Sequence, residues 1–311
     1  MDFDYIKGLL DKEGFCESVL LTLEGPPGRE LQKEGFPAAV LAALPYPCGE
    51  TADLSTPEDP HALLAPFARE NYYQEAVKRL KRVAEILREE GKFRKRDFRL
   101  FVNSRLPEKS LALAGGIGFQ GKNSLIIVPA RGSLIVLAGM ALPFLPSGKV
   151  ERKNSAESCG TCRRCVEACP TGAILPEGGL VREKCLQEMA TGNMPETAWE
   201  AWGTRLYGCQ ICQDVCPHNR SPLRQGITAP GRLGPSVSIR EILRRGKDLK
   251  QIFTGSVLDR KWISPEHLLR NCIIAGGNHP WGGAVKAEIE TYGDHSEEII
   301  ARAARWSLNR L

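Results

Sequence analysis

The sequence lacks the features of membrane and secreted proteins. Its 311 residues contain no run of eighteen or more apolar residues, so we expect no membrane-spanning helix. The N-terminus, Met1 to Tyr5, is acidic and precedes no apolar stretch, which argues against a secretory signal. Internal repeats and low-complexity tracts are also absent. These absences predict a cytoplasmic protein.

The chain has only a small excess of positive charge. Its 42 Lys and Arg residues against 37 Asp and Glu residues give a formal charge of +5. A role with nucleic acid must therefore depend on where the basic residues lie. A dense stripe occurs within 71–99: Lys78, Arg79, Lys81, Arg82, Arg88, Lys92, Arg94, Lys95, Arg96 and Arg99. This stripe predicts a phosphate-binding surface, although a solvated helix face gives the same pattern.

The hydrophobic pattern predicts three regions: an α/β domain over 1–150, a loop-rich module over 151–225 and a C-terminal segment over 226–311. The first contains expected strands at 19–23, 38–42 and 98–102, and a hairpin whose strands at 125–128 and 134–137 flank the turn 130–132. A helix over 71–90, with Gly91 as C-cap, would bury Tyr73, Ala76, Val77, Leu80, Ala84 and Leu87. Helix starts at Ser264 and Ser296 predict a short HEAT-like helical hairpin.

Eleven cysteines in a chain with no secretory features indicate metal or redox chemistry rather than disulfides. Cys159-x2-Cys162-x2-Cys165-x3-Cys169-Pro is the run that bacterial ferredoxins use for 4Fe-4S clusters. In this run three cysteines bind one cluster and the fourth binds its neighbour. The middle region is therefore predicted to be a bacterial-ferredoxin-like module with two 4Fe-4S clusters.

The second half of the module is Cys209-x2-Cys212-x3-Cys216-Pro. Leu206 occupies the place where a further ligand is expected, and Cys185 can supply the missing thiolate. The predicted ligands are Cys159, Cys162, Cys165 and Cys216 for cluster 1, and Cys169, Cys185, Cys209 and Cys212 for cluster 2. Zinc sites also use C-x2-C pairs, but they do not require two runs that end in Cys-Pro. The isolated Cys16, Cys48 and Cys272 are expected to be small buried hydrophobes.

From Arg69 to Asn278 the chain resembles the epoxyqueuosine reductase family. The matching segments are Phe67-Ala68-Arg69 with Tyr72, Glu108 to Ala112, Gly116 to Ser124, Gly132-Ser133, Cys169 to Ala173, Tyr207-Gly208-Cys209, Leu269-Arg270-Asn271 and Gly277-Asn278. The resemblance implies a cobalamin-dependent enzyme of queuosine tRNA modification, related to reductive dehalogenases. In this family two clusters pass electrons from an external donor to cobalamin, and the epoxide is reduced to an alkene.

The resemblance also implies a cobalamin-binding function for the N-terminal domain. The residues implied to contact the cofactor are Arg69, Asn71, Gly121, Lys122, Asn123, Ser124, Gly132 and Ser133. Gly116, Gly118 and Gly121 also fit a dinucleotide fingerprint, but a strand rather than a helix is expected at Leu125, which argues against NAD. Glycines here would let the backbone approach a planar corrin closely, although a plain tight turn explains them as well.

The sequence departs from the family where protons are handled. The family's Asp before Glu-Lys corresponds to Asn103, whose amide cannot act as a general acid. The family's Asp-Tyr-His reads Asn71-Tyr72-Tyr73. The remaining candidate proton donors are Tyr72, Tyr73 and Glu108. The alternative for each tyrosine is packing at the start of the helix, and the alternative for Glu108 is a structural ion pair.

Three functions are compatible with these residues. The first is a reductase of epoxyqueuosine in tRNA, with the basic stripe of 71–99 contacting tRNA. The second is a related corrinoid and iron–sulfur reductase of a small molecule, and the third is a two-cluster electron carrier for a corrinoid partner. The long N-terminal domain weighs against the carrier. We expect a monomer that does not bind membranes, and clusters with a purely structural role remain an alternative.

Overall fold

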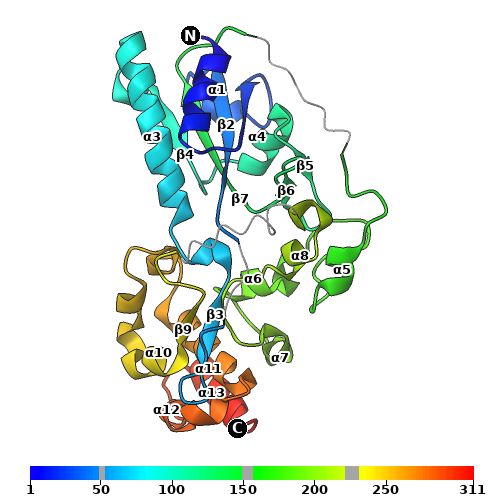
Figure 1. Cartoon of the computed structure of the whole chain (residues 1–311), viewed down its shortest axis with the longest axis vertical. Coiled ribbons are helices and arrows are strands. Elements are labelled where there is room, and N and C mark those ends of the chain that lie inside the picture. The colour runs from blue at the N-terminus through cyan, green and yellow to red at the C-terminus, as the bar shows by residue number, and fades with distance from the viewer. Residues whose placement is uncertain (49–52, 149–156, 221–230) are drawn as a thin grey trace. The chain divides into compact units, whose positions relative to one another are not determined.

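The computed structural model describes residues 1–48, 53–148, 157–220 and 231–311 (Figure 1). These residues form two compact units, each built from segments that are distant in the sequence. Unit 1 contains the described residues of 1–46, 72–162 and 216–220, and unit 2 those of 47–71, 163–215 and 231–311. The predicted boundaries at 150 and 225 lie outside the described residues, and the three predicted regions do not coincide with the two units.

Unit 1 is built on a four-stranded antiparallel sheet in the order β1-β2-β7-β4. Its strands are β1 (Glu17–Thr22), β2 (Ala38–Pro45), β7 (Ile135–Leu142) and β4 (Arg99–Phe101). The register aligns Leu20 with Val40 and Val40 with Met140. Alternating residues such as Val19, Leu21 and Leu41 form a core with Leu111 of helix α4 (Glu108–Gly115). The mixed α/β content predicted for this part of the chain is confirmed.

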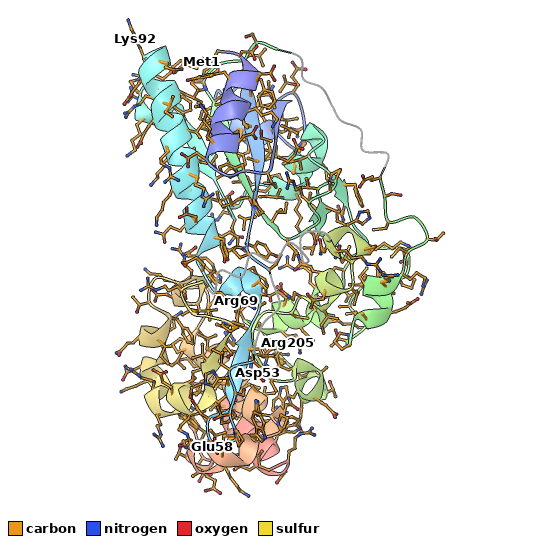
Figure 2. All side chains as sticks on the ribbon, in the orientation of Figure 1. Met1, Asp53, Glu58, Arg69, Lys92 and Arg205 are labelled. Atoms are coloured by element: carbon orange, nitrogen blue, oxygen red, sulfur yellow. The ribbon has the colours of Figure 1, made fainter. Side chains whose placement is uncertain are left out.

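Helices α1 (Phe3–Lys12) and α3 (Tyr72–Gly91) also pack against this sheet (Figure 1). Of the predicted apolar stripe of α3, Ala76, Leu80 and Leu87 are buried, and Tyr73, Val77 and Ala84 are only partly buried. Val83, which was not predicted, is fully buried. Gly91, the expected C-cap, is instead the last helical residue, and the residue after it, Lys92, takes the left-handed conformation with φ of 54°. Figure 2 labels Lys92 at this end of α3. A Cβ on Gly91 would lie 2.2 Å from the Phe93 ring, so a larger residue there would displace that ring.

The hairpin predicted over 125–137 is wrong in its pairing. β6 (Ile126–Ile127) pairs with β5 (Phe119–Gln120), while β7 pairs with β2 and β4. Only an isolated bridge between Val128 and Gly132 closes the predicted turn. In the core sheet, β7 has a pairing partner on each side, whereas a hairpin with 125–128 would give it only one. Hydrophobic periodicity predicts a strand but does not say which strand it pairs with. No helix follows Gly121 before Leu142, in agreement with the argument against a dinucleotide site.

Unit 2 has a three-stranded sheet in the order β8-β3-β9. β3 (His61–Leu64) runs parallel to β8 (Arg205–Tyr207) and antiparallel to β9 (Ser236–Ser238). Short helices surround the cysteines, as expected where clusters replace an apolar core: α5 (Arg164–Ala168), α6 (Leu186–Met189), α7 (Trp199–Trp202) and α8 (Ile211–Asp214).

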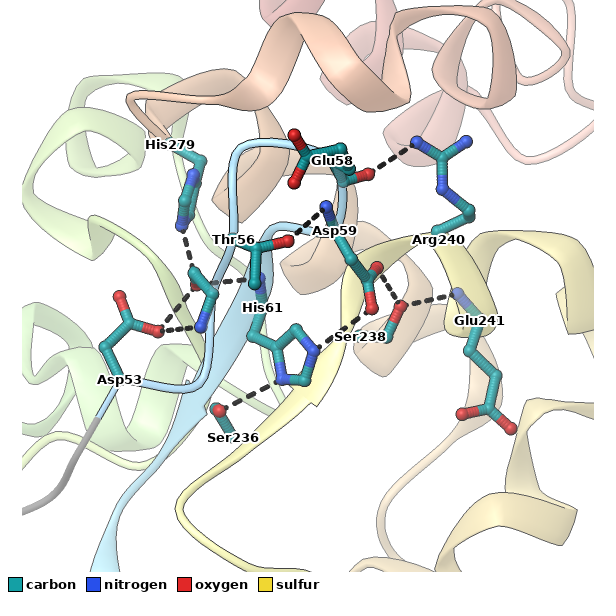
Figure 3. A network of polar contacts seen from close by, with 11 residues as sticks. Asp53, Thr56, Glu58, Asp59, His61, Ser236, Ser238, Arg240, Glu241 and His279 are labelled. Atoms are coloured by element: carbon teal, nitrogen blue, oxygen red, sulfur yellow. Dashed lines mark hydrogen bonds and ion pairs between the residues drawn. The ribbon is translucent and has the colours of Figure 1, made fainter.

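A polar network fixes the start of β3 (Figure 3). The two ring nitrogens of His61 lie 3.2 Å from Asp59 Oδ2 and 3.1 Å from Ser236 Oγ. Ser238 donates to the other Asp59 oxygen, and Ser55 Oγ lies 3.1 Å from His279 Nε2. The residue types are those of a hydrolase triad, but Ser236 is only 5% exposed and lies in a strand, so its hydroxyl is unsuited to attack a substrate. The network is structural.

The C-terminal part of unit 2 is helical, as predicted. α11 (Pro265–Asn278) begins after Ser264, whose hydroxyl accepts from the His267 N–H, and α13 (Glu298–Leu308) packs against α11. A further short helix, α12 (Lys286–Glu290), separates them in sequence, and α10 (Ile239–Arg245) precedes them. The predicted start at Ser296 is one residue early, because Glu297 is the N-cap of α13.

The remaining elements are short. They are α2 (Arg29–Lys33), η1 (Pro66–Ala68), η2 (Lys95–Asp97), η3 (Arg182–Lys184), η4 (Glu196–Ala198), η5 (Pro217–Asn219), η6 (Gly246–Phe253), η7 (Val257–Asp259) and η8 (Gly282–Val285), where η denotes a 3-10 helix. Across the described residues, every helix is too short or too polar to traverse a bilayer.

Candidate functional site

Three of the four predicted ligands of cluster 2 interact within unit 2. Burial raises the pKa of the Cys209 thiol, and negative charge on Cys185 and Cys169 raises it further. Burial also acts on Cys169, but backbone N–H groups at Thr171 and Ala173 outweigh it and lower the pKa of that thiol. The Ala173 N–H lies 3.3 Å from Cys169 Sγ. Cys169 and Cys185 therefore lie close enough to Cys209 for their charges to act on it, as ligands of one cluster would.

A buried clamp from α11 fixes the chain on both sides of these cysteines. Arg270 is 1% exposed, and its guanidinium donates to the backbone carbonyl of Met189, the last residue of α6, at 2.8 Å and to that of Gly192 at 2.7 Å. Asn271 donates to the carbonyls of Ala190 and Leu206, both at 3.1 Å. Because α6 starts after Cys185 and Leu206 precedes Cys209, the clamp sets the position of both cysteines.

The clamp is a functional feature that the sequence prediction did not assign. Burial lowers the pKa of Arg270 to about 10, and no acidic side chain in the described part of the chain forms an ion pair with it. Asn278 extends the clamp by donating to the carbonyls of Trp199 and Gly203 around α7. The clamp residues do lie in two of the segments that resemble the family, Leu269-Arg270-Asn271 and Gly277-Asn278, but the sequence assigned no role to these segments.

Three of the four predicted ligands of cluster 1 interact within unit 1. Burial raises the pKa of the Cys216 thiol, and negative charge on Cys159 and Cys162 raises it further. Cys216 is 8% exposed and begins the turn η5. The fourth predicted ligand, Cys165, lies on α5 and belongs to unit 2, so its place in cluster 1 stays a prediction from the spacing.

All eight predicted cluster ligands lie in the described part of the chain. The case for clusters over zinc rests on the spacing of these cysteines in the sequence, because zinc sites do not require two runs that end in Cys-Pro.

Of the remaining cysteines, Cys48 and Cys272 are buried as expected, whereas Cys16 is only partly buried. Cys272 is fully buried on α11, and burial raises the pKa of its thiol strongly. Its Sγ contacts the Ile239 carbonyl at 3.8 Å. Burial also raises the pKa of the Cys16 and Cys48 thiols.

The loop between β5 and β6 lies directly against the cluster-1 cysteines. The backbone N–H of Lys122 points at Cys159 Sγ at 3.4 Å, and its Nζ donates to the Cys162 carbonyl at 3.0 Å. Lys122 therefore brings a backbone dipole and a positive charge to the ligand segment, and both favour electron-rich sulfur. The neighbouring Asn123 is 5% exposed and accepts from the Leu125 N–H, and Ser124 has a left-handed φ of 62°.

The glycines of this region are explained without a ligand. A Cβ on Gly118 would lie 2.2 Å from the Ile127 carbonyl oxygen, and one on Gly121 would lie 2.7 Å from Asn123 Oδ1. These glycines let β5 and β6 come together. They do not by themselves indicate a corrin, and the alternative of a tight turn accounts for them.

The other glycine-containing segment, Gly132-Ser133, forms hydrogen bonds with the turn after Cys216. Asn219 Oδ1 accepts from the Ser133 N–H at 2.7 Å, and Asn219 Nδ2 donates to Ser133 Oγ at 3.1 Å. A Cβ on Gly132 would lie 2.0 Å from Asn219 Oδ1. Ser133 and Asn219 are both buried, so this pair holds the Cys216 turn against β7. The predicted cofactor segments 121–124 and 132–133 thus both contact cluster-1 ligand segments.

Two of the candidate proton donors, Tyr73 and Glu108, lie near each other at the N-termini of α3 and α4. Burial raises the pKa of the Tyr73 hydroxyl, and the negative charge of Glu108 raises it further. Burial also raises the pKa of Glu108. Hydrogen bonds from the Ser104 and Asn103 N–H groups, at 2.7 and 3.1 Å, lower this pKa but only partly offset the effect of burial. Glu108 therefore holds the turn in which Asn103 adopts a left-handed φ of 48°. Tyr73 is the hydroxyl that faces this carboxylate.

The other predicted site residues have structural contacts. The Tyr72 ring packs against Tyr46 with centroids 5.6 Å apart, the packing alternative named above. Arg69 is buried in unit 2, where Nε donates to the Leu64 carbonyl (Figure 2). Asn71 is 7% exposed, and its N–H donates to Glu70.

Acidic neighbours neutralise half of the basic stripe over 71–99. Ion pairs join Arg79 to Glu75, Arg82 to Glu13, Arg88 to Glu89, Arg94 to Asp97, and Arg99 to Glu30 and Glu34. Within the described residues, Lys78, Lys81, Lys92, Lys95 and Arg96 form no ion pair. A second basic run is more fully neutralised, because Arg240 and Arg244 pair with Glu288 and Arg245 with Glu241.

Comparisons with known proteins bear on these sites. The family described as a 4Fe-4S double cluster binding domain matches residues 158–219. Epoxyqueuosine reductase of Vibrio cholerae is 32% identical over 283 residues, which cover 87% of this chain and 73% of that protein. The enzyme of the same name from Listeria monocytogenes is 40% identical over 216 residues, 66% of this chain and 54% of that protein. The chain spans about half the length of several curated relatives, such as that of Bacillus anthracis, of which it covers 54%.

Solved structures share the fold. An epoxyqueuosine reductase with an epoxyqueuosine-modified tRNA-Tyr stem loop superposes with a TM-score of 0.78 at 22% identity, covering 99% of this chain and 90% of that one. The epoxyqueuosine reductase of Streptococcus thermophilus gives a TM-score of 0.79 with the same identity and coverage. At this identity the similarity shows the fold alone.

Proposed function

Because this chain belongs to the epoxyqueuosine reductase family, we propose that it reduces epoxyqueuosine in tRNA to queuosine with two 4Fe-4S clusters and cobalamin. The observation that carries the proposal is the contact of Lys122 with Cys159 and Cys162. It joins a segment that the family uses for the corrin to the ligands of one cluster. Such contact favours electron transfer between the two groups, since neighbouring centres exchange electrons readily.

The overall reaction consumes two electrons and two protons. Both C–O bonds of the epoxide break, the two carbons become an alkene, and the oxygen leaves as water. An external donor supplies the electrons through the clusters, and cobalamin, when bound, supplies a strongly reducing cobalt centre. The backbone and polar groups of Lys122, Asn123, Ser124, Gly132 and Ser133, with Arg69 and Asn71, are the proposed cofactor contacts.

Tyr73 is the proposed proton donor to the departing oxygen. A tyrosine hydroxyl is protonated at neutral pH, and Tyr73 lies close enough to Glu108 for the carboxylate charge to act on it. Glu108 is occupied as acceptor of two backbone N–H groups. Asn103 lies in the same turn but has no acidic proton. Lys78 and Lys81 on α3 and Lys92 directly after it form no ion pair within the described residues, and they are the proposed tRNA contacts. We further propose a cytoplasmic monomer with a HEAT-like pairing of α11 and α13.

Incubation of the reduced holo-protein with epoxyqueuosine-containing tRNA tests the activity. Mass spectrometry of the nucleosides should show loss of one oxygen. Unchanged tRNA, with both clusters and cobalamin intact and the reductant active, would refute the tRNA substrate. A small-molecule epoxide is the second candidate, favoured by Asn103 and Tyr73 in place of the family's acid and imidazole, and turnover of free epoxyqueuosine nucleoside alone would support it.

Tyr73→Phe tests the proton donor. We expect it to lower kcat by about 10²-fold with little change in tRNA affinity, the usual contribution of a positioned acid. Asn103→Asp introduces a carboxylic acid into the same turn, where Asp tolerates the left-handed conformation, and in the Tyr73→Phe background it should restore part of the rate. A Tyr73→Phe protein with the rate of the unmodified chain would remove this residue as the donor.

A further inference from the structure

An exposed tryptophan on a firmly held loop of unit 2 has no role in the fold described above. Trp262 is 50% exposed, although most large apolar side chains of the chain are buried. It follows η7 and precedes α11. The guanidinium carbon of Arg260 lies 5.1 Å from the centre of its ring, so a cation is stacked on the indole.

Lys250 holds this loop in place. Its ammonium donates to three backbone carbonyls of the loop, those of Leu258, Arg260 and Ile263, the last two at 3.1 and 2.8 Å. Further bonds run within the loop, from the Arg260 N–H to the Val257 carbonyl and from the Ile263 N–H to the Arg260 carbonyl, both at 3.1 Å. The loop is therefore ordered before any partner arrives, which reduces the entropy lost on binding.

The loop carries positive charge that the described residues do not neutralise. In contrast to Arg240 and Arg244, neither Arg260 nor Lys261 forms an ion pair within the described part of the chain. The nearest carboxylate in sequence, Asp259, accepts from the Gly255 N–H at 3.1 Å. The exposed Arg232 adds a third cation, since its Cζ lies 3.3 Å from the position of a Cβ on Gly255.

We propose that Trp262 is a stacking platform for an unpaired base of an RNA, with Arg260, Lys261 and Arg232 contacting the flanking phosphates. An ordered aromatic face beside unpaired cations is the combination by which proteins bind single-stranded nucleic acid. The inference deepens the proposed function, because the RNA would be the tRNA substrate and the base one of its unpaired nucleotides. On this proposal, the surface around Trp262 binds the substrate, and other residues carry out the reaction.

Trp262→Ala should weaken binding of epoxyqueuosine-containing tRNA at least about fivefold, the lower range for loss of one stacked base. Trp262→Phe should keep most of the affinity because it retains an aromatic face. Trp281→Ala is the matched control, since Trp281 is 41% exposed in the same unit and contacts His279 rather than a cation. A blunt RNA duplex without unpaired bases should bind the unmodified chain and Trp262→Ala equally.

Arg260→Gln combined with Lys261→Gln should reduce the slope of log affinity against log salt by about one to two, as phosphate contacts require. Unchanged tRNA affinity in Trp262→Ala would overturn the platform, and so would an equal loss in Trp281→Ala. If Trp262→Ala left the affinity for RNA unchanged but lowered the affinity for a protein partner, the surface would be a protein contact, and this result would also overturn the platform. These outcomes are separate from the failure of the proposed function, which is a lack of epoxide reduction by the unmodified chain.

Discussion

The segments that carry the two ligand sets are held by different interactions. In unit 2 a buried cation reaches the cluster-2 segment from α11, far along the chain, and binds backbone carbonyls after α6. In unit 1 the cluster-1 segment is held by the neutral pair of Ser133 and Asn219 and by Lys122. A buried cation without a carboxylate partner is strongly tied to its acceptors, so cluster 2 should depend more on its clamp than cluster 1 does.

Removing the cation should give the largest effect. Arg270→Met fills a similar volume but leaves the Met189 and Gly192 carbonyls without their donor. We expect the free energy of unfolding to fall by about 3 kcal/mol, and iron to drop from about eight toward about four per chain as cluster 2 is lost. Urea denaturation and iron analysis measure the two changes.

Arg302→Met is the matched control for Arg270→Met. Arg302 is half-exposed on α13 and pairs with Glu196, so its loss should cost less than about 1 kcal/mol. Equal iron content in Arg270→Met and Arg302→Met would show that the clamp does not hold the cluster-2 cysteines.

Breaking the neutral pair should have a moderate effect on the other cluster. Asn219→Ala removes the acceptor of the buried Ser133 N–H, and we expect a loss of about 1.5 kcal/mol in unfolding free energy. Electron paramagnetic resonance of the reduced protein should show a changed cluster-1 signal with cluster 2 preserved. Asn309→Ala, at an exposed position, serves as control, and a change confined to cluster 2 would contradict the assignment.

Lys122→Met should have the smallest effect on stability, below about 1 kcal/mol, since the backbone N–H to Cys159 remains. Removing a positive charge next to the ligands disfavours the added electron, so the reduction potential of cluster 1 should become more negative. Redox titration followed by spectroscopy measures it. The exposed Lys33→Met should leave the potential unchanged, and an equal shift in that variant would remove Lys122 from this role.

The sequence predicted the elements that depend on local pattern. Helix α3, strands β1, β2 and β4 and the helices after Ser264 follow from apolar periodicity and capping residues. The sequence-based prediction was wrong where tertiary contacts determine strand pairing. For example, β7 pairs within the core sheet and not with 125–128. Segments 47–71 and 163–215 lie in one unit with the C-terminal helices, which no local pattern signals.

The sequence alone predicts the cluster ligands, because the cube itself sets the spacing of the cysteines that bind it. It does not predict the clamp, because Arg270 acts on backbone carbonyls that have no sequence signature. The sequence also did not reveal the local reason for Gly118, since a Cβ there would lie 2.2 Å from the Ile127 carbonyl oxygen of the same hairpin.

Iron and acid-labile sulfide per chain, measured after anaerobic reconstitution, test the central claim that eight thiolates hold two cubes. We predict about eight of each for the unmodified chain and about four for Cys185→Ser, whose cluster 1 should survive. About two zinc ions with no sulfide, or a Cys185→Ser protein that retains all its iron, would contradict it.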